Sequence, residues 1–222
     1  MGRKLVATSP AFDKPAQFIT FEGGEGSGKS TQIKLLADWL KHQNIDVILT
    51  REPGGTQSAE ALRSILLTGD PDRWDGMSEL LLLYAGRHDH VEKLIKPALA
   101  KGTWVLCDRF ADSTMAYQGY GHGLGVETVS AIHKIALGDF KPDLTLLFDI
   151  PVDLGLQRAV ERRGDEMRYE EMDISFHDKL RAGYMEIAKS NPKRCEIINA
   201  DQTIELVRED IRDTIAKRFS LS

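Results

Sequence analysis

Short apolar runs alternate along this chain with longer segments whose apolar residues recur at helical spacing. The spacing i, i+3, i+4, i+7, or a close variant, appears in segments 33–40, 91–99 and 204–215, which predicts helices with one buried face. The short runs are rich in β-branched and aromatic residues, which favours strands. Five strands are predicted: Phe18–Glu22, Val47–Thr50, Trp104–Asp108, Leu144–Ile150 and Glu196–Asn199.

Strands that alternate with helices are typical of an α/β fold, so we predict a parallel five-stranded sheet flanked by helices on both faces. A chain of 222 residues suits one domain of this kind. We place that domain at residues 18–222, after a loose tail at 1–17 that contains Pro10 and Pro15. Two segments, 68–76 and 161–171, are dense in charged or turn-forming residues and are predicted to be loops.

A glycine-rich motif follows the first predicted strand. Residues 23–30 satisfy GxxxxGK[ST], the P-loop pattern, and an amphipathic segment begins near Thr31. Glycines let backbone N–H groups curl around phosphate oxygens, the lysine reaches the β- and γ-phosphates, and the hydroxyl binds Mg²⁺. We therefore predict a site for ATP and Mg²⁺, made by Gly23, Gly24, Glu25, Gly26, Ser27, Gly28, Lys29, Ser30 and Thr31.

The rest of the chain favours a kinase over other P-loop proteins. It lacks the Asn-Lys-x-Asp guanine reader of GTPases and the Leu-Ser-Gly-Gly-Gln segment of ABC-type ATPases. Charged residues instead end successive strands, where open α/β sheets bind ligands. Arg51 and Arg109 can neutralise an anionic phosphoryl acceptor, and Asp108 can serve the metal beside Ser30. Asp149 ends another apolar strand and is the rival metal carboxylate, ranked second.

Composition narrows the choice of partners. With 29 basic and 34 acidic residues the formal net charge is −5, which offers no overall positive field for a nucleic-acid polymer. The sequence has no run of roughly 20 apolar residues, so we expect no membrane partner and a cytoplasmic location. The two cysteines lie in apolar surroundings without zinc-ligand spacing, which favours core positions.

Four segments together resemble the thymidylate kinase family. They are Phe18-Ile-Thr-Phe-Glu-Gly with its P-loop, Thr50-Arg-Glu-Pro-Gly-Gly-Thr56, Asp108-Arg-Phe, and Ser113 followed by Ala116-Tyr-Gln-Gly119. The resemblance extends from about residue 18 to 188. It implies a P-loop kinase fold with a mobile lid, and transfer of the γ-phosphoryl group of ATP to dTMP with Mg²⁺. That reaction is a step in dTTP synthesis, and the resemblance also implies a homodimer.

The resemblance also implies roles for individual residues. Arg51 and Arg109 hold the dTMP phosphate, and Glu25 lies near the 3′-hydroxyl of the sugar. The remaining substrate residues line the same pocket or contact the nucleoside: Arg63, Leu83, Arg87, Ser113, Tyr117 and Gln118.

Two features place the chain within that family. The P-loop carries Glu25 and no arginine, whereas the predicted lid, about 158–171, carries four arginines, so the chain looks like the bacterial type with a catalytic lid arginine. Arg162 and Arg168 are the chosen candidates among the four. Family members commonly place an aromatic residue where this chain has Leu83, so either Leu83 packs on the base or the adjacent Tyr84 replaces it, and Phe110 can add apolar surface.

Three alternatives remain open on the sequence. The enzyme could phosphorylate another nucleotide or nucleoside, because Leu83 departs from the family pattern. The chain could also be an ATP-binding module without transfer activity, although Lys29, Ser30, Asp108 and Arg109 are all intact. Nucleic-acid binding is disfavoured because there is no basic run.

Overall fold

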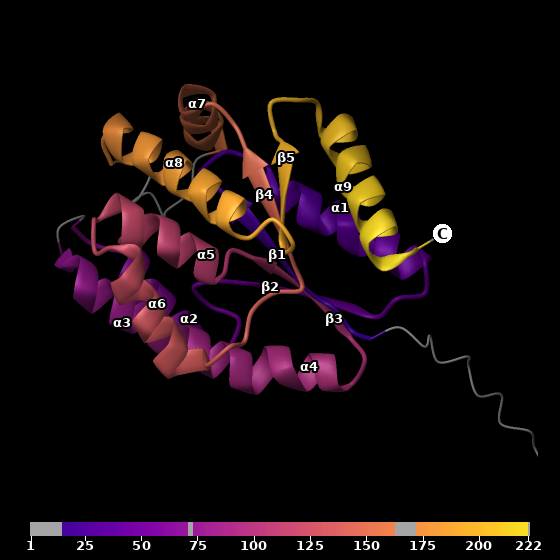
Figure 1. The fold of residues 1–222 in the computed structure, drawn as a ribbon, viewed down its shortest axis with the longest axis horizontal. Coiled ribbons are helices and arrows are strands. Elements are labelled where there is room, and N and C mark those ends of the chain that lie inside the picture. Colours follow the sequence, from indigo (N-terminus) through magenta and orange to yellow (C-terminus); the bar gives the residue numbers. More distant parts are fainter. Residues whose placement is uncertain (1–14, 71–72, 163–171, 222) are drawn as a thin grey trace, which may run out of the picture.

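A five-stranded parallel sheet forms the centre of the computed structural model, which describes residues 15–70, 73–162 and 172–221 (Figure 1). The strands lie in the order β2-β3-β1-β4-β5 and each pairs in parallel with its neighbours. Every strand end falls within one residue of the prediction, so the predicted sheet is confirmed. The bounds are β1 (Phe18–Gly23), β2 (Val47–Arg51), β3 (Trp104–Asp108), β4 (Leu144–Asp149) and β5 (Cys195–Asn199).

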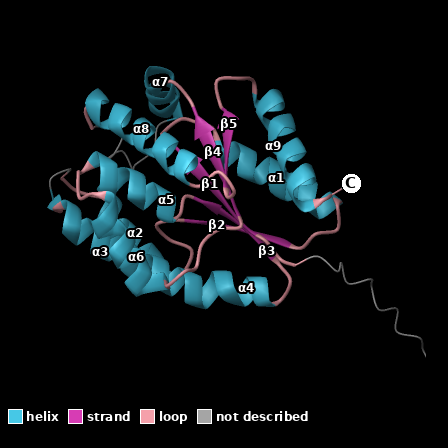
Figure 2. Cartoon of the chain, viewed as in Figure 1, coloured by secondary structure: helices cyan, strands magenta, loops and turns pink. Residues whose placement is uncertain are grey.

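Helices cover both faces of the sheet (Figure 2). On one face lie α1 (Lys29–His42) and α9 (Ile204–Phe219), which contact each other. On the other face lie α4 (Lys96–Ala100), α5 (Ala111–Thr114) and α8 (Ile174–Ser190). The remaining helices are α2 (Gln57–Leu67), α3 (Gly76–His90), α6 (Val126–Leu137) and α7 (Val152–Arg162), with π-helical turns at η2 (Val91–Ile95) and η3 (Met115–Gly121).

The two faces follow from the alternation of side chains along each strand. In β1, Ile19 and Phe21 join the core under α1 and α9, whereas Phe18 joins the core on the opposite face. Glu22 shares the parity of Phe18, so it points toward the same opposite face although it carries a carboxyl group. The sheet therefore buries a polar side chain beside the end of β3, where the site described below is built.

Most residues of the predicted helical stripes are buried. The predicted stripe residues of segment 33–40, Ile33, Leu36, Ala37 and Leu40, lie in the core, as do Val207, Ile211 and Ile215 of α9. In segment 91–99, Val91 and Ile95 are buried, whereas Leu94, Ala98 and Leu99 are partly buried. Ile204 is 54% exposed, so its predicted place in the core is wrong. It is the first residue of α9, where only one neighbouring turn is present to cover it.

The predicted loops are confirmed only in part. Between α2 and α3 the described residues form turns, and Asp75 caps α3 by accepting hydrogen bonds from two backbone N–H groups. The loop expected from residue 161 is wrong for its first two residues, because α7 continues to Arg162. Residues 163–171 and residues 1–14 of the predicted tail lie outside the described residues. No helix in the described part of the chain has the length and apolarity to cross a membrane.

Candidate active site at the carboxyl ends of the strands

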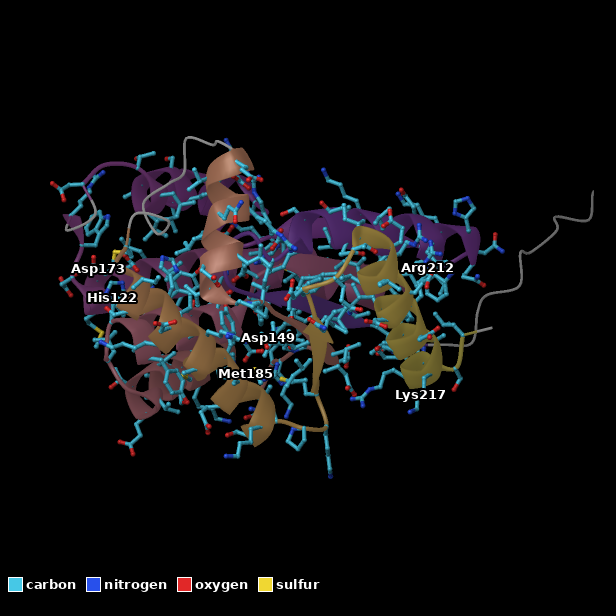
Figure 3. The ribbon with its side chains drawn as sticks, turned by 90° about the horizontal axis from the view of Figure 1, so that it is seen from above. His122, Asp149, Asp173, Met185, Arg212 and Lys217 are labelled. Atoms are coloured by element: carbon cyan, nitrogen blue, oxygen red, sulfur yellow. The ribbon has the colours of Figure 1, made fainter. Side chains whose placement is uncertain are left out.

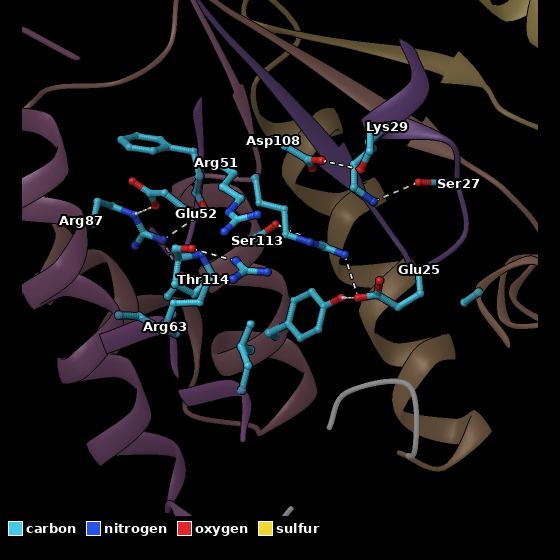
Figure 4. A pocket seen from close by; sticks show the side chains of 18 of the residues that line it. Glu25, Ser27, Lys29, Arg51, Glu52, Arg63, Arg87, Asp108, Ser113 and Thr114 are labelled. Carbon is cyan, nitrogen blue, oxygen red and sulfur yellow. Dashed lines mark hydrogen bonds and ion pairs between the residues drawn. The ribbon is translucent and has the colours of Figure 1, made fainter. Parts of the chain in front are cut away.

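The ends of β1, β2 and β3 open into one cavity of about 610 Å³ (Figure 4). The P-loop forms one wall, the segment after β2 together with α2 and α3 forms another, and the segment after β3 forms the third. Most residues proposed from the sequence line it: Glu25, Gly26, Ser27, Gly28, Lys29, Ser30, Arg51, Arg63, Leu83, Arg87, Asp108, Arg109, Ser113, Tyr117 and Gln118. Gly23, Gly24 and Thr31 do not line this cavity and only flank it in the chain.

The P-loop takes its shape from glycines in backbone conformations that residues with a side chain rarely adopt. Gly26 and Gly28 have φ values of 64° and 89°, and Gly28 stands directly before the first residue of α1. A Cβ at Gly26 would come within 1.9 Å of the carbonyl oxygen of Gly155 in α7, so the loop and α7 are in direct contact. The loop therefore presents the N-terminus of α1 to the cavity, the arrangement that binds phosphate.

Lys29 is folded into the P-loop. Its ammonium donates to the carbonyl oxygens of Gly23, at 3.0 Å, and Gly24, at 2.7 Å, and to the hydroxyl of Ser27, at 3.1 Å. Only 6% of the residue is exposed. Burial, together with the nearby positive charge of Arg109, lowers the pKa of Lys29 to about 8. A polyanion placed in the loop would supply the negative charge that this buried ammonium lacks.

Ser30 and Asp108 form the pair of oxygen groups expected of a metal site. The Ser30 hydroxyl donates to Asp108 Oδ2 at 2.8 Å, which brings the first turn of α1 to the end of β3. Asp149, the rival carboxylate, instead accepts two hydrogen bonds from Arg181 at 2.7 and 3.0 Å, and lies beside α8 near Met185 (Figure 3). The structure favours Asp108, because Asp149 is already neutralised by an arginine.

The oxygen groups at Ser30 and Asp108 fit a magnesium ion. Mg²⁺ is usually held by one or two carboxylates together with waters and the phosphates of the substrate, and rarely by a complete cage of protein ligands. In keeping with this, the described residues contain no cluster of three or more His, Cys, Asp or Glu side chains suited to a metal. A hydroxyl and one carboxylate beside a phosphate-binding loop match that pattern.

Arg109 turns back beneath the P-loop. Its backbone φ of 67° is rare for a residue with a side chain, and its N–H donates to the carbonyl oxygen of Phe21. The guanidinium then donates to the carbonyl oxygen of Gly23 at 3.0 Å and to Glu25 Oε1 at 2.7 Å. Tyr117 donates to the same oxygen of Glu25 at 2.7 Å. Arg109, Glu25 and Tyr117 thus form one connected group between the P-loop and η3.

Arg51 and Arg63 lie on the wall opposite the P-loop. The Arg51 side chain is 55% exposed and pairs with Glu60 at 3.1 Å, so it can turn toward an anion at little cost. Arg63, on α2, donates to the carbonyl oxygen of Pro53 at 2.7 Å. Together with Arg109 they surround the cavity with positive charge, although each comes from a different element.

Part of the cavity lining is apolar. Leu83 and Phe110 line the cavity together with Arg87, whose guanidinium lies over the ring of Phe110 with 5.3 Å between the charge and the ring centre. Tyr84 does not line the cavity: it is 3% exposed and its hydroxyl hydrogen-bonds with His133. Of the two alternatives for base packing, the structure therefore favours Leu83.

The predicted substrate residues Ser113 and Gln118 already have partners in the protein. The Ser113 hydroxyl hydrogen-bonds with Glu22 and with Tyr184, and Gln118 donates to Glu79 at 2.5 Å. Both are buried. Their contacts with the protein hold the segment after β3 in place without a ligand.

Sequence reasoning missed two buried carboxyl groups. Glu22 accepts from the backbone N–H of Phe110 at 2.8 Å and from Ser113, while Glu52 accepts from Arg87 Nε at 2.6 Å. Burial, with the nearby charge of Asp112, raises the pKa of Glu22 to about 7. Glu22 could have been noticed from its place in an otherwise apolar strand, whereas the burial of Glu52 depends on how α3 packs against the loop.

The lid arginines are only partly described. Arg158 donates to the carbonyl oxygen of Ala200 at 3.1 Å and does not line the main cavity. Arg162 is the last residue of α7. Arg163 and Arg168 lie outside the described residues, so the choice of a catalytic lid arginine stays a prediction.

Comparisons with known proteins agree on one family. The family model "Thymidylate kinase" matches residues 21–211. The chain is 52% identical to a thymidylate kinase of Caulobacter vibrioides over 92% of its length and 98% of that protein. It is 50% identical to one from Afipia carboxidovorans, over 92% of this chain and 90% of that protein. Among solved structures, thymidylate kinase from Ehrlichia chaffeensis matches with a TM-score of 0.73 and 37% identity, covering 90% of this chain and 99% of the other.

Proposed function

The chain belongs to the thymidylate kinase family, whose function is the phosphorylation of dTMP, and we propose that it transfers the γ-phosphoryl group of ATP to dTMP with Mg²⁺ in the cavity described above. The products are dTDP and ADP, and dTDP is the precursor of dTTP. One observation carries the proposal: a phosphate-binding loop and four arginines from separate elements line a single cavity.

The donor side of the site is the P-loop. Backbone N–H groups from Gly24 to Thr31 surround the phosphates of ATP, and Lys29 exchanges its loop acceptors for the β- and γ-phosphate oxygens. Ser30 and Asp108 would hold Mg²⁺, which would neutralise charge on those phosphates. Because the transferred group carries negative charge, most of the catalysis consists of positioning and electrostatic stabilisation.

The acceptor side is formed by the opposite walls. Arg51 and Arg109 align the dTMP phosphate with ATP, and Arg63 adds positive charge behind them. Glu25, already bonded to Arg109 and Tyr117, lies where a sugar hydroxyl can donate to it. Leu83 and Phe110 pack on the base, and Ser113 and Gln118 support that end.

Arg87 differs from the other arginines and serves the base. Its partner Glu52 neutralises its charge, and the side chains of both are almost completely buried. A compensated arginine adds little attraction for a phosphate, but its N–H groups remain good donors to a neutral base. We therefore place the thymine end of dTMP beside Arg87.

A lid closes the site in this proposal. Residues of about 158–171 bring Arg162 or Arg168 over ATP, which excludes water and adds positive charge at the transferring group. The contact between Gly26 and Gly155 supports it, because any movement of α7 is transmitted to the P-loop. The lid belongs to the single domain that we assign to residues 18–222.

The enzyme acts as a homodimer in the cytoplasm in this proposal. Helices α3 and α6 contact each other and expose large apolar side chains, including Leu81 at 51% and Ile135 at 82%. Such side chains on neighbouring helices suit a symmetric contact with a second copy. Light scattering of wild type and Leu81→Asp measures this: the variant is expected to be monomeric at a concentration at which wild type is a dimer.

The activity is tested by ADP release with ATP and Mg²⁺ against dTMP, dUMP, dCMP, dGMP and thymidine, each compared with a control without acceptor. A strong preference for dTMP is expected, and it should disappear in a folded Lys29→Ala protein. Preference for another acceptor would refute the thymidylate assignment. ATP binding without acceptor-dependent ADP release would refute the kinase and leave an ATP-binding module.

A further inference from the structure

His90 lies at the last position of α3, outside the cavity, and is fully buried. Its Nδ1 donates to Glu52 Oε1 at 2.9 Å, and its Nε2 hydrogen-bonds with Thr50 Oγ1 at 2.7 Å. Thr50 precedes Arg51 in β2 and Glu52 follows it, so the imidazole bridges the chain on both sides of a phosphate-binding arginine. No role in phosphoryl transfer requires an imidazole at this position.

The loop after β2 is closed around this histidine. Gly55 has a φ of 90°, and a Cβ there would come within 2.3 Å of His90 Nε2 and 2.6 Å of Thr50 Oγ1. The loop therefore lies so close to the imidazole that a side chain at position 55 would not fit. A buried group that is enclosed in this way and bonded through both ring nitrogens has one allowed orientation.

Glu52 shares its two oxygens between two partners. Oε1 accepts from His90, and Oε2 accepts from Arg87 Nε at 2.6 Å. With His90 at Oε1, the carboxylate meets the guanidinium through Oε2 alone. Arg87 Nη2 donates instead to the Thr114 hydroxyl at 2.7 Å and to the carbonyl oxygen of Phe110, while Nη1 has no hydrogen-bond partner among the described residues.

We propose that His90 is a positioning residue for the acceptor: through Glu52 it fixes the guanidinium of Arg87 so that a donor stays available to the base. The inference rests on the proposed function, because it assigns the Arg87 end of the cavity to thymine. His90 touches neither substrate, and its effect passes through one carboxylate. The free donor is Nη1, since every other N–H-bearing nitrogen of this side chain bonds to protein.

Two substitutions separate this role from general structural support. In His90→Asn the amide nitrogen reaches the place of Nδ1 and keeps the bond to Glu52, whereas the bond to Thr50 is lost. In His90→Gln the amide reaches the place of Nε2 and keeps the bond to Thr50, whereas the bond to Glu52 is lost. Each variant retains one of the two hydrogen bonds, so both are expected to unfold at a lower temperature than wild type. His88→Asn, at an exposed histidine of the same helix, is the control.

The measurements are the Kd of dTMP by calorimetry without ATP, the Kd of ATP, and kcat and KM for each variant. We expect His90→Gln to bind dTMP about tenfold more weakly, because the base loses one hydrogen bond from the charged Arg87. His90→Asn should stay within about threefold of wild type. The Kd of ATP and kcat should equal those of wild type in both variants. His88→Asn should match wild type in every measurement.

Equal losses of dTMP affinity in the two variants, following their losses of thermal stability, would overturn the inference and leave His90 with a structural role. A greater loss in His90→Asn, or no loss in His90→Gln, would also overturn it. Wild-type protein that fails to bind dTMP would refute the proposed function as well as this inference. Wild type that binds and phosphorylates dTMP, with His90→Gln unaffected, would refute this inference alone.

Discussion

Replacing Glu22 with glutamine should change how the stability of this protein depends on pH. Glu22 is fully buried at the end of β1, and burial with the nearby charge of Asp112 raises its pKa from an ordinary value of 4.5 to about 7. The protonated carboxyl is therefore the form that the fold prefers. Glutamine keeps a carbonyl oxygen for the N–H of Phe110 and an amide for Ser113, but it never ionises.

The sign follows from the raised pKa. Below the unfolded-state pKa the folded protein gains the full contribution of neutral Glu22, and it loses that contribution as the pH rises through about 7. A shift from 4.5 to about 7 corresponds to about 3 kcal/mol. We expect the unfolding free energy of Glu22→Gln, relative to wild type, to rise by about that amount between roughly pH 5 and pH 8.

Urea unfolding of both proteins across this pH range measures the difference directly. Glu196→Gln, at an exposed position of β5, is the control and should give a difference that does not change with pH. A constant difference between wild type and Glu22→Gln would show that Glu22 ionises at its ordinary pKa, and the account of its burial would fail. A difference that falls as pH rises would contradict the sign.

Three further predictions concern the ligands. At about pH 8, ATP binding should take up roughly half a proton, because the phosphates raise the pKa of Lys29 back toward its ordinary value. Calorimetry in buffers of different ionisation enthalpy should detect this proton uptake, and Lys29→Met should abolish it. Asp108→Asn should raise the Mg²⁺ concentration for half-maximal activity at least about tenfold, whereas Asp149→Asn should not, because the Asp149 carboxylate pairs with Arg181. Leu83→Phe should lower the KM for dTMP about three- to tenfold by stacking on the base, and an unchanged or higher KM would count against the base packing on residue 83.

The sequence alone determined the sheet and the P-loop. Helices could be placed because the 3.6-residue period of apolar residues is a local property of the chain, and strands because short runs of β-branched and aromatic residues are local as well. The P-loop could be read for the same reason: strand, glycines, Lys29 and helix are contiguous, and their geometry depends on neighbours in sequence. Residues that end parallel strands, such as Arg51 and Asp108, were also expected to meet, because those ends share one edge of the sheet.

Only the tertiary structure decided which polar groups are buried and which are paired. Asp108 and Asp149 end similar strands, but Asp149 forms an ion pair with Arg181 of α8. Arg181 lies 32 residues away in the sequence, and no local pattern reveals the pairing. Glu52 is buried because α3 brings Arg87 and His90 to it from 35 and 38 residues away. A pKa or an orientation set by such contacts depends on packing between distant elements, which is why the sequence named the chemistry of the site and the fold decided how its groups are held.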